Sequence, residues 1–171
     1  MKMNYKAAAV ALASLFSVSA FAVQKDITVV ADIDPTIELL QADGSALPQS
    51  LRMSYLPGVG LLNEKVSTKI YTNDATQKVQ VRLLSEPQLL AVTNPSAAAI
   101  PLKVTYNGSE LSTAVIDLQP ATLFPNGRID NGSIPMDLVI GQKTPGVVAT
   151  AGSYQGVVSV ILNTAAVSAN L

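Results

Sequence analysis

Cysteine, histidine and tryptophan are absent from the 171-residue sequence. The lack of cysteine excludes disulfide bonds, thiolate nucleophiles and zinc–cysteine sites. The lack of histidine removes the usual general base of hydrolase triads and the commonest metal ligand. Charged residues make up only 13% of the chain and aromatic residues 5%. Catalysis would have to depend on carboxylates, Lys, Ser or Tyr, so the composition argues against an enzyme and predicts no cofactor.

The first 22 residues have the pattern of a secretory signal peptide. A start containing two lysines is followed by ten mostly apolar residues, 7–16. The small–x–small triplet Ala20-Phe21-Ala22 then predicts cleavage between Ala22 and Val23. Since a membrane-spanning helix needs about 20 apolar residues, the short apolar stretch favours cleavage over anchoring. We therefore expect an exported protein.

The mature chain is the size of one domain. Removal of the first 22 residues leaves 149, and it removes two of the eleven basic residues and none of the twelve acidic ones. The remaining net charge of −3 lacks the basic surface expected of a nucleic-acid-binding protein. A chain of this length can bury about 68–70% of its unfolded surface, so packing alone can stabilise it without disulfides.

Apolar and polar residues alternate along most of the mature chain. This period of two is typical of strands with one buried face and one solvated face. It is clearest in four stretches: 65–70, 78–83, 136–140 and 154–162. In the last stretch, Tyr154, Val158, Val160 and Leu162 fall on one face.

Turn signals separate the alternating stretches. Pro57-Gly58 is one, and Asn107-Gly108 is the strongest, because Asn-Gly supplies the two positive φ angles of a type I′ hairpin. Helical spacing is weak and confined to Ser85–Val92 and Ala114–Leu123. Short strands with turn signals about every ten residues predict an all-β sandwich or barrel.

The acidic residues form no convincing catalytic or metal-binding pattern. Asp32 and Asp34 lie two apart, which fits the polar face of an alternating strand. Asp130-Asn131-Gly132 begins like a calcium loop, but the position of the closing Glu is occupied by Gly141. The sequence therefore predicts no metal site.

The mature N-terminus, residues 23–34, is the most unusual feature. Its odd-numbered positions are apolar except for Lys25, and its even-numbered positions are mostly polar. Eleven residues of strand reach roughly 35 Å at about 3.3 Å per residue. From the pattern alone, two interpretations stay open: a first strand paired within its own domain, or a strand that pairs with another molecule.

Three stretches carry a resemblance to a known family: Val23–Val29, Asp34–Gly44 and Thr150–Ser159. In these stretches the chain resembles the major subunits of colonization-factor-antigen fimbriae, the α-type or class 5 chaperone–usher pili. It is similar also to cable-pilus major subunits. The likeness covers nearly all of the mature chain and is weakest at 56–62 and 122–134. The residues after Leu162, 163–171, form a longer tail than the family leads us to expect.

The resemblance implies an immunoglobulin-like sandwich, residues 35–171, that lacks its final strand. The N-terminal strand of a neighbouring copy, residues 23–34, would complete it by donor-strand exchange, a form of strand addition to an exposed sheet. The implied inserting side chains of the donor strand are Val23, Ile27, Val29, Ala31 and Ile33. The implied wall of the acceptor groove consists of Tyr154, Val158, Val160 and Leu162.

The resemblance also implies a set of partners. These are identical pilin subunits, a periplasmic chaperone, an outer-membrane usher and a tip adhesin, with export through the periplasm to a cell-surface fimbria. Head-to-tail contacts of this kind build an open filament. The rival interpretation is a self-complete secreted β-sandwich that binds a ligand, as an adhesin does. We expect 149 residues to leave no room for the second, lectin-like domain of a dedicated tip adhesin.

Overall fold

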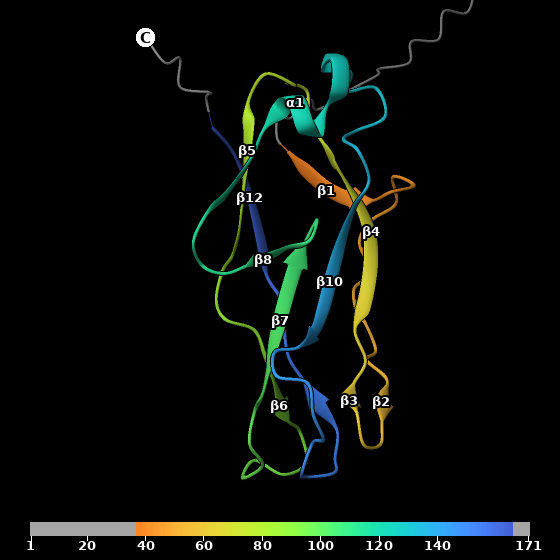
Figure 1. Ribbon diagram of the computed structural model, residues 1–171, viewed down its shortest axis with the longest axis vertical. Coiled ribbons are helices and arrows are strands. Elements are labelled where there is room, and N and C mark those ends of the chain that lie inside the picture. Colours follow the sequence, from red (N-terminus) through yellow and green to blue (C-terminus); the bar gives the residue numbers. More distant parts are fainter. Residues whose placement is uncertain (1–36, 166–171) are drawn as a thin grey trace, which may run out of the picture. The chain divides into compact units, whose positions relative to one another are not determined.

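The computed structural model describes residues 37–165. The chain separates into two units, Met1–Ile33 and Asp34–Leu171, and the described residues all belong to the second. These residues are almost entirely β-structure, in two main layers (Figure 1). The prediction of an all-β fold is therefore confirmed.

The larger layer is built around three long antiparallel strands. The order along the sheet is β1, β4, β10, β7, β6 and β11, with β8 also paired to β7. The bounds are β1 (Glu38–Gln41), β4 (Glu64–Tyr71), β10 (Met136–Gln142), β7 (Ile100–Tyr106), β6 (Gln88–Ala91), β11 (Tyr154–Gln155) and β8 (Ser109–Leu111).

The smaller layer has three strands in the order β12, β5 and β9. The bounds are β12 (Val160–Ala165), β5 (Lys78–Leu83) and β9 (Ile116–Leu118). A separate hairpin consists of β2 (Tyr55–Leu56) and β3 (Gly60–Leu61). The helical elements of the described residues are two short ones, α1 (Pro120–Leu123) and the 3-10 turn η1 (Pro125–Gly127). Within residues 37–165 no helix is long and apolar enough to cross a membrane.

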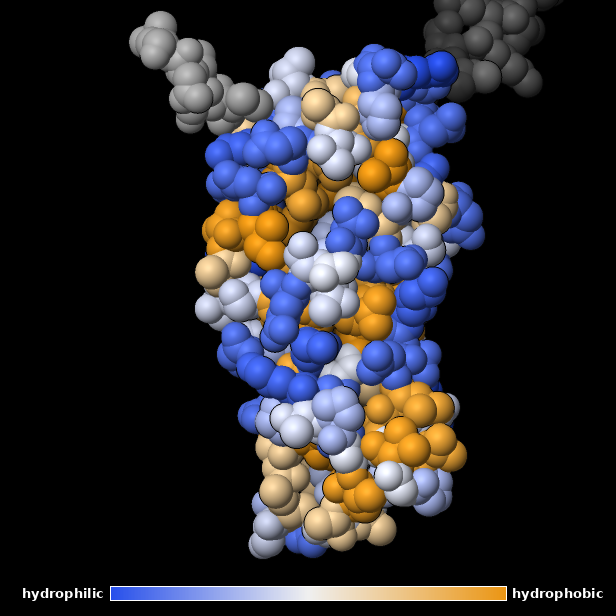
Figure 2. All heavy atoms as spheres, viewed as in Figure 1, coloured by the Kyte–Doolittle hydropathy of each residue, from blue (hydrophilic) through white to orange (hydrophobic). Residues whose placement is uncertain are grey.

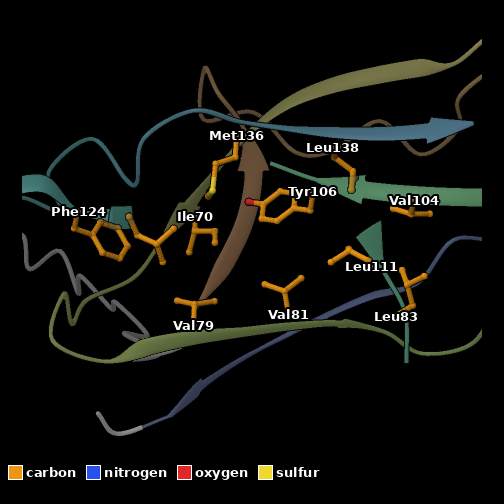
Figure 3. Packing of buried hydrophobic residues seen from close by; sticks show 11 residues of the cluster. Ile70, Val79, Val81, Leu83, Val104, Tyr106, Leu111, Phe124, Met136 and Leu138 are labelled. Carbon is orange, nitrogen blue, oxygen red and sulfur yellow. The ribbon is translucent and has the colours of Figure 1, made fainter. Parts of the chain in front are cut away.

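The core lies between the two layers, as the alternating pattern predicts. Val79, Val81 and Leu83 point inward from β5, and each is only 1% exposed. Figure 3 shows these side chains facing Ile70 and Tyr106 of the larger layer. Because successive residues of a strand point to opposite faces, the polar residues between them remain accessible to solvent.

The segment 109–118 joins the two layers along one side. β8 pairs with β7 of the larger layer, and β9 pairs with β5 of the smaller one. Between these strands, the backbone N–H of Leu83 donates to the carbonyl oxygen of Ser112 at 2.7 Å. The sheet therefore curls over the core on this side, and within residues 37–165 β1 is an edge strand of the larger layer and β12 an edge strand of the smaller one.

The predicted Asn-Gly hairpin is confirmed. Asn107 and Gly108 have φ angles of 48° and 80° and join β7 to β8. The two weakly helical stretches of the sequence have different outcomes: 85–92 contains the strand β6, whereas 114–123 contains the three-residue strand β9 followed by the four-residue helix α1.

The stretch 154–162 differs from the single strand that its pattern suggests. It forms β11 and β12, separated by residues 156–159, which belong to neither strand. Gly156 packs against the backbone of Gln88, where a Cβ atom would overlap the carbonyl group. Directly after β11 the chain thus still lies close to the first residue of β6.

Candidate functional site

The candidate site is the edge strand β12. Among the described residues, β12 pairs with one neighbour only, β5, in antiparallel register from Val160 opposite Leu83 to Ala165 opposite Lys78. The other side of β12 therefore presents backbone N–H and C=O groups that no described strand pairs. Such an edge is a template for another strand.

The inner face of β12 is apolar and incompletely covered. Val160 and Leu162 lie opposite Leu83 and Val81, so all four side chains point to the same face. Leu83 and Val81 are each 1% exposed, whereas Val160 and Leu162 are only partly buried against the core. Val158, just before the strand, is partly buried in the same way. This face is ready to accept further apolar side chains.

β1, an edge strand of the larger layer, also has apolar side chains that are incompletely covered. Leu39 lies opposite the fully buried Ile70 and is itself only partly buried, as is Ile37 just before the strand. The edges β1 and β12 thus both leave apolar core side chains incompletely covered. The alternation of Ile37 and Leu39 is visible in the sequence, but assigning these residues to the site requires the sheet order.

The structure brings together three of the four predicted acceptor residues and separates the fourth. Val158, Val160 and Leu162 lie along the same side of the core. Tyr154 instead belongs to β11, opposite Ala91 of β6 in the larger layer. Its hydroxyl donates to the carbonyl oxygen of Thr150 at 2.8 Å, and its ring lines a surface depression of about 240 Å³.

The five predicted donor residues, Val23, Ile27, Val29, Ala31 and Ile33, lie outside the described residues. The predicted cleavage point at Ala22 and Val23 does so as well. Of the C-terminal tail, residues 163–165 extend β12, with Thr164 opposite Val79 on the inward side. β12 thus runs further than Leu162, the last residue of the predicted groove.

β12 itself contains no charged residue, and the ion pairs of the described residues lie on other elements. On the outer face of the smaller layer, Lys78 and Asp117 form an ion pair of 2.6 Å, and hydrogen bonds from Lys78 and Gln80 lower the pKa of Asp117. Asp130, considered above as a calcium ligand, binds Arg128 at 2.9 Å, and this contact lowers the pKa of its carboxyl group. In the part of the chain that the structure describes, no cluster of three or more acidic residues could hold a metal ion.

Comparison with known proteins identifies the family. The model of the CS1-type fimbrial major subunit matches residues 23–163. The chain is 43% identical over 167 residues to a CFA/I fimbrial subunit from Escherichia coli O78:H11, covering 95% of this chain and 98% of that protein. It is 40% identical over 168 residues to a CS1 fimbrial subunit from Escherichia coli, with the same coverage.

Solved structures agree with this relationship. The CooA pilin subunit from enterotoxigenic Escherichia coli matches with a TM-score of 0.66 at 36% identity, covering 76% of this chain and 88% of that one. A chain from a chaperone–tip adhesin complex of CFA/I fimbriae biogenesis matches with a TM-score of 0.53 at 14% identity, over 75% of this chain and 42% of that one, which is a likeness of fold.

These matches confirm the resemblance seen in the sequence and the immunoglobulin-like character of the fold. The family is structural rather than enzymatic, and its members are the subunits of cell-surface fimbriae. The chain therefore belongs to the CS1-type fimbrial major subunits.

Proposed function

We propose that the chain polymerises head to tail by donor-strand exchange. In this proposal, residues 23–34 of each following copy pair with the free edge of β12 in the copy before it. The side chains of Val23, Ile27, Val29, Ala31 and Ile33 enter the space beside Val158, Val160 and Leu162. The observation that carries the proposal is the one-sided pairing of β12, combined with the partial exposure of its inner apolar face.

The edge strand also accounts for the proposed assembly partners. An apolar face beside unpaired backbone groups favours aggregation, so an uncomplemented subunit would need protection during export. A periplasmic chaperone would supply a temporary strand, and an outer-membrane usher would exchange it for the strand of the next subunit. A solved structure of similar fold comes from a chaperone–tip adhesin complex, which supports a chaperone and a tip adhesin as partners here.

In this route the signal peptide, residues 1–22, is removed in the periplasm and frees Val23 to begin the donor strand. Residues 35–171 form the acceptor domain. The fibre is then an open filament, because each copy inserts its donor strand into one neighbour and accepts a donor strand at its β12 edge from another. Backbone hydrogen bonds supply affinity, and the alternate apolar side chains fix the register.

Electron microscopy of cells that express the chain with its assembly proteins tests the proposal. The double variant Ile27→Asp with Val29→Asp places two charges on the inserting face, and we expect it to abolish fibres while the protein stays soluble with its chaperone. The matched control is Thr28→Asp with Val30→Asp, which charges the opposite face and should still give fibres. Normal fibres from the Ile27 and Val29 variant would rule out the donor role. They would favour a self-complete binding module instead.

A further inference from the structure

The β2–β3 hairpin carries a group of exposed apolar side chains that the proposed strand exchange does not use. Tyr55, Leu56 and Val59 are 45%, 47% and 50% exposed. Leu51 and Leu62, on either side of the hairpin, are 39% and 40% exposed. Figure 2 shows hydrophobic surface at the end of the domain where Figure 1 places this hairpin. Contiguous apolar surface of this kind marks an interaction site.

The hairpin is held firmly to the domain, so the exposure is not that of a loose loop. The backbone N–H of Leu61 donates to Oε1 of Gln142 in β10 at 3.2 Å, and within the hairpin the N–H of Leu62 donates to the carbonyl oxygen of Ser54 at 2.8 Å. Gly60 packs so closely against Gly146 that a Cβ atom would overlap the carbonyl oxygen. The hairpin is therefore a preformed surface.

The strand register places the hairpin at one end of the domain and the start of β1 at the other end. Gln142, which holds the hairpin, is the last residue of β10. β12 begins towards the same end (Figure 1), because Val160 lies opposite Leu83, and Leu83 bonds to Ser112 just after β8, beside the part of β7 that pairs with the end of β10. Glu38, the first residue of β1, lies opposite Tyr71, the last residue of β4. β4 begins beside the hairpin end, with Glu64 opposite Ile140 of β10.

Chain length then limits where the following copy can lie; this step rests on the proposed strand exchange. A final strand of an immunoglobulin-like sheet runs antiparallel to its neighbour, so the donor strand leaves the groove near Val158, at the hairpin end. Four residue steps separate Ile33, the last inserting residue, from Ile37 of the donating copy. An extended chain covers at most about 14 Å in four steps, which brings the β1 end of the donating copy to the hairpin end of the acceptor.

We propose that the apolar side chains of the β2–β3 hairpin dock against the β1 end of the following copy in the fibre. The partner is thus a second copy of this chain, tethered by its own donor strand. The tether makes the contact effectively intramolecular, so a small apolar surface is enough to fix the angle between successive subunits. The hairpin would stiffen the joint, whereas the donor strand provides the connection.

The absence of cysteine makes a direct cross-linking test possible. The variant Val59→Cys with Glu38→Cys carries one thiol on the hairpin and one at the exposed start of β1. Fibres of this variant are treated with a flexible bis-maleimide, dissociated by heat and separated by size. The control is Val115→Cys with Glu38→Cys, because Val115 is 49% exposed but precedes β9, on the side of the smaller layer away from β12. Each single-cysteine variant is tested in parallel.

We expect a ladder of covalent oligomers from the Val59 and Glu38 pair and none from the Val115 pair. Fibres that form normally but give no ladder with Val59 would overturn the docking proposal and leave strand exchange intact. Equal ladders from both pairs would overturn it as well. Failure of the parent chain to form any fibre would instead count against the proposed function.

Discussion

Val160 lies directly opposite Leu83 in the β12–β5 ladder, and the two side chains point to the same face, yet only Leu83 is fully buried. Opposite residues of one antiparallel pair normally share their surroundings. The difference arises because β5 has a neighbour on each side, whereas β12 has one among the described residues. An additional strand at the edge of β12 would therefore cover apolar side chains that are now only partly buried.

Substitution on the inner face of β12 should block assembly from the acceptor side. We expect Val160→Asp to give a folded protein that forms no fibres. Position 160 is only partly buried in the single subunit, so the carboxylate can remain hydrated there, whereas an inserted strand would bury it. Asn163→Asp is the matched control, since Asn163 is exposed and lies opposite Gln80 on the outer face. Electron microscopy and circular dichroism provide the readouts. Wild-type fibre yield from Val160→Asp would show that β12 is not the acceptor.

Two glycines of the hairpin should differ in their tolerance of alanine. Gly58 and Gly60 both have positive φ angles, +82° and +112°, but a Cβ atom at Gly58 meets nothing within 4 Å. Gly58→Ala should therefore lower the free energy of unfolding by only the backbone strain, about 1–2 kcal/mol. Gly60→Ala should lower it further, because the added methyl group must displace Gly146 and Gln142. Urea denaturation measures both, and equal losses would contradict the close packing of the hairpin base.

The buried Tyr106 should make the domain sensitive to alkaline pH. Burial raises the pKa of its hydroxyl to about 12, from about 10 in an unfolded chain. The unfolded state therefore loses this proton first, so stability is complete below pH 10 and falls as the pH rises from 10 towards 12. Between pH 8 and pH 11 the free energy of unfolding should fall by about 1.4 kcal/mol through this residue.

Tyr106→Phe is the control for this alkaline loss. Thr68 keeps its hydrogen bond to the carbonyl oxygen of Met136 at 2.9 Å in this variant, so only the weaker 3.4 Å contact with the Tyr106 hydroxyl is removed. We expect a cost at neutral pH of about 0.5–1.5 kcal/mol. The variant should lose less stability than wild type between pH 8 and pH 11. Identical alkaline losses in the two proteins would exclude Tyr106 as the cause.

The local pattern predicts strands and turns well in this chain. Along β5, alternation alone identifies Val79, Val81 and Leu83 as inward-facing, because a strand has a fixed period of two. Asn107-Gly108 likewise predicts its hairpin, because few other residue pairs accept two positive φ angles.

Features that depend on contacts between residues far apart in the sequence cannot be predicted from the local pattern. Tyr154 has the right spacing to share a strand with Val160, but it pairs with Ala91 of β6 whereas Val160 pairs with Leu83 of β5. The turn at Pro57-Gly58 is visible in the sequence, whereas the base of its hairpin is fixed by Gln142, 81 residues after Leu61. The partial exposure of Val160 cannot be predicted from the sequence pattern either, because it depends on which strands cover this residue.

The central claim is that the domain is incomplete without a strand from another copy. The most direct measurement is the melting temperature of the chain with residues 23–33 fused through a flexible linker to its C-terminus. A strand that completes the ladder and covers β12 should raise the melting temperature by more than about 5 °C, given roughly 2–4 °C per kcal/mol in a domain of this size. The same fusion with Ile27→Asp and Val29→Asp in the added strand should give no rise. An unchanged melting temperature with the unaltered strand would contradict the account.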